Sequence, residues 1–128
     1  MKFEECVEEG SVVKISKDMR RSRSLLRIAE DRLKYLDKEK ITKLNSNFIL
    51  EQYYSAFIEI IHSLALKRGY KILNHLCLKS FIEEVLSKPK IAEKFDKFRK
   101  IRNNLVYYGI KVDSTVAKKR INEIKDLI

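Results

Sequence analysis

An arginine inside an otherwise apolar helical face is the residue of this chain best placed to do chemistry. Between residues 91 and 105, apolar side chains recur at the spacing of one helix face, namely Ile91, Phe95, Phe98, Ile101 and Leu105. Arg102 falls within that arc. Because a guanidinium keeps its charge, its burial needs a carboxylate, a subunit interface or an anionic ligand nearby. We therefore expect any active or ligand-binding site here.

The polar residues that follow Arg102 could complete such a site. Asn103 and Asn104 offer hydrogen bonds, and Tyr107 and Tyr108 can donate a hydrogen bond or stack on a base. Arg102 could stabilise a phosphate or a developing negative charge. Five residues turn an ideal helix by about 140°, so Arg102 and Tyr107 should diverge. We expect them to converge only if the helix unwinds at the asparagines, or if a second subunit completes the site.

A purely structural role for Arg102 is the alternative, in which it pairs with a buried acid such as Glu51 or Glu59. The usual catalytic motifs are missing, including HExxH, the P-loop, the dinucleotide-binding glycine turn and the nucleophile elbow. The two histidines, His62 and His75, come with no clustered carboxylates. We therefore expect neither a metal nor a cofactor.

The charge of the chain favours a polyanionic partner. Its 28 Lys and Arg against 18 Asp and Glu give a net charge of +10. Residues 11–40 and 87–111 carry most of this excess, and Arg20, Arg23 and Arg27 form a basic ridge on one helix flank. The predicted nucleic-acid contacts are Arg99, Arg102, Asn104, Tyr108, Arg20, Arg23 and Arg27. The alternative is an ordinary solvated face, neutralised in part by neighbouring acids.

Hydrophobic spacing predicts an all-α protein, a single domain over residues 1–128 with an up-and-down four-helix bundle and an additional short helix. Residues 1–15 form a short helix and an extended connector in this prediction, and Ser16 caps the first long helix. The Tyr53, Tyr54 and Phe57 group is assigned to the core. The predicted helices cover residues 3–9, 17–40, 47–68, 75–87, 89–107 and 113–127.

Two further expectations concern the environment of the protein. Cys6 and Cys77 lie in apolar helical contexts, and we predict that they are reduced packing residues without a disulfide. No apolar run is long enough to cross a bilayer, and no signal-peptide pattern opens the chain. We therefore expect a soluble cytoplasmic protein with no membrane contact.

Several segments together resemble the HEPN family. They are Tyr53–Phe57 on the second long helix, Gly69–Lys71 after it, Asn74-His75 at the start of the next helix, and the Arg102-Asn103 pair. The resemblance implies a helical bundle that is commonly dimeric. Many HEPN proteins are metal-independent endoribonucleases, including toxins encoded beside a small nucleotidyltransferase, and others are substrate-binding partners of nucleotidyltransferases.

One element of the family motif is missing. The motif places a histidine after the arginine and its polar neighbour, whereas the candidate positions here hold Tyr107, Tyr108 and Gly109. A tyrosine with a pKa of about 10 is roughly a thousandfold less ionised at neutral pH than a base that titrates near pH 7. The sequence thus supports binding of RNA or nucleotide better than catalytic cleavage of RNA.

Three functional hypotheses follow. The first is a dimeric HEPN-like module that binds RNA or nucleotide and works with a nucleotidyltransferase-type partner, with two Arg102 side chains approaching in the dimer cleft. The second is an active endoribonuclease that uses Arg102, Asn103 and Tyr107, or a remote His75 as the base. The third is a helical scaffold for protein association.

Overall fold

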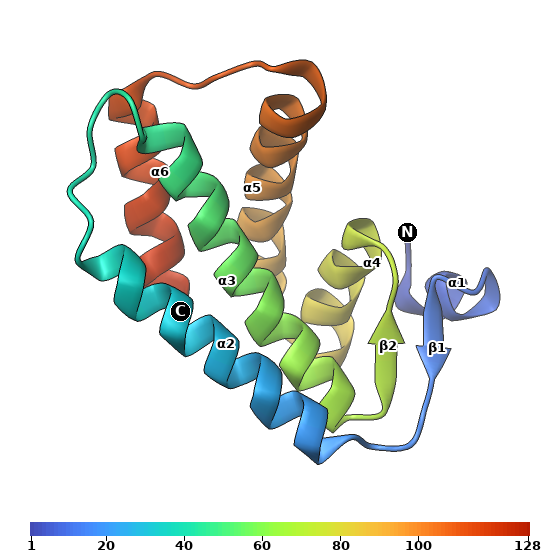
Figure 1. Cartoon of the computed structure of the whole chain (residues 1–128). Helices are drawn as coiled ribbons and strands as arrows, with labels where there is room; N and C mark the ends of the chain where they lie inside the picture. The colour runs from blue at the N-terminus through green and yellow to red at the C-terminus, as the bar shows by residue number, and fades with distance from the viewer.

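The computed structural model describes residues 1–128, and it is mostly helical, as predicted (Figure 1). None of its helices has an apolar stretch of the length that a bilayer crossing requires. Along the chain, the elements are α1 (Phe3–Glu8), β1 (Val12–Lys14), α2 (Met19–Asp37), α3 (Ser46–Lys67), β2 (Tyr70–Ile72), α4 (His75–Ser80) with a π-helical continuation (Phe81–Val85), α5 (Pro89–Tyr108) and α6 (Ser114–Leu127).

Helix α3 is the centre of the molecule, with α2, α5 and α6 around it (Figure 1). Its buried residues cover more than one face and include Tyr53, Tyr54 and Phe57, as the sequence predicts. Helix α2 runs antiparallel to α3. The hydroxyl of Ser22 donates to the carbonyl of Ser63 at 2.8 Å, and the hydroxyl of Ser63 donates to the carbonyl of Ser22 at 2.8 Å. These short side chains let the two backbones approach closely.

The helix ends follow from local chemistry. The Asp18 side chain accepts a hydrogen bond from the Arg21 amide at 3.0 Å and so caps α2. The prediction that Ser16 caps this helix was wrong, since a carboxylate two residues later has the geometry to accept. Asn74 caps α4 in the same way, through the amide of Cys77 at 2.9 Å. Pro89 begins α5, and Gly109, with φ +64°, ends it.

The segment predicted as a connector contains a β-strand. Val12–Lys14 pairs antiparallel with Tyr70–Ile72, and Val12 lies opposite Ile72. The prediction of an extended connector over residues 11–15 gave the backbone conformation but not the pairing, because the partner strand lies almost sixty positions away in sequence. Gly69 makes this approach possible. At φ +86°, a Cβ on this residue would lie 2.8 Å from the carbonyl oxygen of Ile15.

The two cysteines form a disulfide, so the prediction of free thiols was wrong. Cys6 of α1 and Cys77 of α4 are fully buried, with Cα atoms 6.0 Å apart. That separation is within the usual range for a disulfide. Their apolar contexts in the sequence reflect burial, but burial alone does not distinguish a thiol from a bonded cysteine. The bond fixes the N-terminal segment to α4.

Candidate nucleotide-binding site

Arg102 is half-buried on α5 and makes no ion pair. Its guanidinium carbon lies 5.9 Å from the ring centroid of Tyr54 and 5.8 Å from that of Tyr107. Both distances are within the range of a cation–π interaction. Two aromatic rings, rather than a carboxylate, therefore contact the permanent charge.

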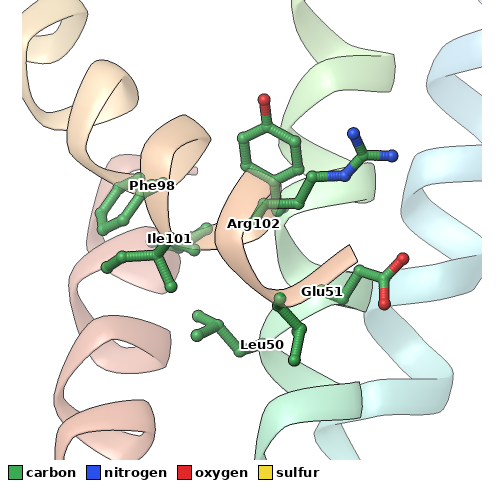
Figure 2. Close-up of a pocket in the computed structure, with 8 residues that line it drawn as sticks. Leu50, Glu51, Phe98, Ile101 and Arg102 are labelled. Atoms are coloured by element: carbon green, nitrogen blue, oxygen red, sulfur yellow. The ribbon is translucent and has the colours of Figure 1, made fainter. Parts of the chain in front are cut away.

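The two acids proposed as partners of Arg102 do not neutralise it. Glu59 instead pairs with Arg32, whose Nε lies 2.6 Å from Glu59 Oε1. Glu51 lines the same small cavity as Arg102 but forms no ion pair with it. Figure 2 shows the Arg102 and Glu51 side chains extending toward the same side, away from Phe98. The guanidinium thus remains available to an anion.

The cavity at this point of the fold is too small to hold a ligand. Its volume of about 10 Å³ is close to the space of one water molecule. Packed apolar side chains form most of its wall, namely Leu50, Phe98, Ile101, Leu105 and Ile124. A ligand of Arg102 must therefore bind on the outer side of the guanidinium, over the exposed aromatic ring of Tyr107.

Helix α5 continues unbroken through the two asparagines to Tyr108. The prediction that Arg102 and Tyr107 converge only through unwinding or a second subunit was therefore wrong. Arg102 nevertheless meets Tyr107, because a long guanidinium side chain reaches a ring that is turned away at the Cα. Asn103 is half-buried and Asn104 is exposed, and neither side chain has a hydrogen-bond partner. Tyr107 and Tyr108 are 68% and 74% exposed. All four side chains are thus free to contact a ligand.

Arg99 differs from Arg102 because it is neutralised within the protein. Its Nε and Nη2 lie 2.9 and 2.8 Å from Asp96 Oδ1, and Lys100 Nζ lies 3.3 Å from Asp96 Oδ2. Burial would raise the pKa of Asp96, but the hydrogen bond from Arg99 and the nearby positive charges outweigh it and lower that pKa. Arg99 is therefore a weaker candidate for ligand contact than the sequence indicated.

The structure brings His75 into the site. Its Nδ1 lies 3.1 Å from the hydroxyl oxygen of Tyr54, the residue whose ring faces Arg102. Burial lowers the pKa of His75, and the positive charge of Arg102 lowers it further, so the imidazole is neutral at pH 7. Burial also raises the pKa of Tyr54, partly offset by Arg102, and keeps its hydroxyl protonated. A neutral imidazole can accept a proton.

The sequence gives only a weak signal for this histidine. It directly follows the helix cap Asn74, which fixes where α4 begins, but its contact with Tyr54 spans 21 positions. No local pattern reports such a contact.

The basic ridge lies apart from Arg102. On α2, Lys34 lines a cavity with Tyr53 and with Lys125 of α6. The other flank of α2 faces His62 and β2 through Arg21 and Leu25. At 100° per residue, Arg20, Arg23 and Arg27 share the flank of Lys34. The fold therefore does not join them to Arg102.

Comparisons with protein-family models, with curated proteins and with solved structures give no match to this chain.

Proposed function

We propose that this protein is a HEPN-like module, with α2, α3, α5 and α6 as its four-helix bundle, that binds RNA or nucleotide at Arg102. The observation that carries this proposal is the half-buried guanidinium without an internal carboxylate partner. Three other partly buried arginines, Arg32, Arg99 and Arg120, do have such partners. An anionic ligand would give Arg102 the negative partner that carboxylates of the protein give the other three.

The neighbouring side chains suit a nucleotide better than a simple anion. A phosphate on Arg102 would place the attached base near the exposed ring of Tyr107, which can stack on it. Asn103 and Asn104 add free amide groups that can both donate and accept hydrogen bonds.

The proposed partners follow from the exposed apolar end of α5. Val106, Tyr107, Tyr108 and Ile110 are all exposed, and together they offer a surface for a second copy of the chain. In such a homodimer, two Arg102 side chains would face a shared ligand. A nucleotidyltransferase-type partner is a further proposal, and its support is the resemblance of the sequence to the HEPN family.

A second candidate function, metal-independent RNA cleavage, is favoured by the position of His75. Cleavage requires a base that removes the proton of a ribose 2′-hydroxyl, so that the 2′-oxygen bonds to the adjacent phosphorus while the P–O5′ bond breaks. The 5′-oxygen leaves with a proton from solvent, and a 2′,3′-cyclic phosphate remains. When Nδ1–H of His75 donates to the hydroxyl oxygen of Tyr54, Nε2 carries the lone pair that can take the proton of the 2′-hydroxyl. Arg102 would stabilise the charge that develops on the phosphate. In this assignment His75, rather than Tyr107, is the candidate base.

Fluorescence anisotropy with a labelled single-stranded RNA tests the binding function. Arg102→Gln should weaken binding by about tenfold or more, since a hydrogen bond to a charged group contributes roughly 1.5–3 kcal/mol. Lys119→Gln on α6 is the matched control, because it removes one exposed charge away from the site. Equal losses in both variants would indicate general charge attraction and refute a specific site. If the wild-type protein fails to bind RNA at low salt, the RNA-binding and RNA-cleavage functions are both refuted.

A gel assay for RNA cleavage tests the second function. We expect His75→Gln and Arg102→Gln each to abolish cleavage, while Tyr107→Phe, which keeps the ring, should retain most of it. Cleavage that persists in the Arg102 variant would point to a contaminating nuclease. Loss of activity in Tyr107→Phe with normal RNA binding would instead return the role of the base to the tyrosine.

A further inference from the structure

A second cavity, of about 240 Å³, lies beside α3 between α2 and β2. Three nitrogen-bearing side chains line it, namely Arg21 of α2, His62 of α3 and Lys71 of β2. The rest of the wall is Tyr70 and the apolar residues Leu25, Leu66 and Ile72. No carboxylate is among the residues that line it, so the cavity is suited to an anion.

None of the three basic side chains has an internal partner. Arg21 and Lys71 form no ion pair, and the half-buried imidazole of His62 makes no hydrogen bond. Burial lowers the pKa of His62, so at pH 7 it offers a neutral N–H donor beside two cations. A phosphate could accept hydrogen bonds from all three groups.

This cavity and Arg102 lie on the same side of α3. Tyr54, Ile58 and His62 are spaced by four residues and therefore follow one stripe along the helix. Tyr54 contacts Arg102 at one end of the stripe, and His62 lines the cavity at the other. In Figure 1, β2 and α4 lie beside the C-terminal half of α3. The eight residues from Tyr54 to His62 span about 12 Å along the axis.

We infer that the cavity of Arg21, His62 and Lys71 binds a second phosphate of the same single-stranded RNA that Arg102 holds. The strand would follow α3 from Tyr107 past His75 to the cavity. At the 3.4 Å spacing of a stacked strand, 12 Å corresponds to about three to four nucleotides. This inference rests on the proposed function of Arg102 and extends it from a nucleotide to an oligonucleotide.

The dependence of affinity on RNA length tests the inference. The variant is the double substitution Arg21→Gln with Lys71→Gln, and the probes are a labelled dinucleotide and a labelled octanucleotide of single-stranded RNA. The dinucleotide is too short to span both sites. We expect octanucleotide affinity to fall by about tenfold, with a shallower dependence on salt, while dinucleotide affinity stays unchanged. The control is Lys118→Gln with Lys119→Gln, the same loss of charge on α6, which should change octanucleotide affinity by less than about twofold.

The outcomes separate this inference from the function on which it rests. If octanucleotide affinity is unchanged in the Arg21 and Lys71 variant, the second phosphate site does not exist. Loss of RNA binding in Arg102→Gln would in that case still support the proposed site at Arg102. If the control variant loses as much affinity, the effect is general attraction and the inference fails. Thermal unfolding of each variant, with a midpoint near that of the wild type, excludes misfolding as the cause.

Discussion

Breaking the disulfide between Cys6 and Cys77 should reduce the stability of this protein severely. The bond closes a loop between residues 71 positions apart, and the chain-entropy relation gives about 4 kcal/mol for a loop of that length. Domains of this size are stable by only about 5–15 kcal/mol, so the loss is roughly a quarter or more of the total free energy of unfolding. Because the bond mainly restricts the unfolded chain, the native packing around the two sulfur atoms should change little.

Urea denaturation of the oxidised and the reduced protein measures this effect directly. The reduced wild type is preferable to an alanine variant, since both sulfur atoms stay in the core and no cavity adds to the cost. The reduced sample is prepared by refolding with a reductant, because both cysteines are fully buried. Alkylation with a mass-tagged reagent establishes the thiol state of each sample. A difference in unfolding free energy below about 1 kcal/mol, in samples of verified redox state, would refute the entropic reasoning.

Three other predictions concern the glycines, the α2–α3 contact and the histidines. Gly109→Ala should lower the free energy of unfolding by roughly 1–2 kcal/mol, because the residue has a left-handed backbone conformation. Gly69→Ala should lower it by at least about 1 kcal/mol more, because the new Cβ would also clash with the carbonyl oxygen of Ile15. The denaturant midpoints of the two variants test this difference. Ser63→Ala removes a buried hydrogen bond between helices and should lower the unfolding free energy by about 1 kcal/mol in urea. The pKa of His75 is lowered in the folded protein, so as pH falls the unfolded chain takes up this proton at a higher pH than the folded chain does. Stability should therefore decrease as pH falls below about 6.5. Thermal unfolding of His75→Gln over the same pH range should show a smaller decrease.

Periodicity in the sequence was sufficient to locate every long helix. The apolar stripes and the residues that interrupt helices, such as Gly69 and Pro89, are local signals, and helix ends could be placed within a few residues. The strand at Val12–Lys14 and the Cys6–Cys77 bond could not be located, because each joins segments about sixty or more positions apart. Neither segment carries a local pattern that identifies its partner.

In the candidate site, too, local features could be predicted from the sequence and long-range contacts could not. Arg102 could be predicted because a charged residue within an apolar stripe is a local anomaly, and its contact with Tyr107 lies within one helix. His75 could not be grouped with it, since it comes from α4 and reaches Tyr54 of α3 only in the folded chain. The arginines of the basic ridge are conspicuous in the sequence, but they lie on the flank of α2 that carries Lys34, apart from Arg102.

The contrast among three arginines gives the reason to expect a ligand at Arg102. Arg32 and Arg99 each contact a carboxylate, so this fold can neutralise a partly buried guanidinium. Arg102 contacts two aromatic rings instead, and each cation–π contact contributes about 0.5–2 kcal/mol, less than a charge-assisted hydrogen bond would. The rings hold the guanidinium in place and leave its N–H donors unused. These unused N–H donors are the feature from which we propose an anion that binds from outside.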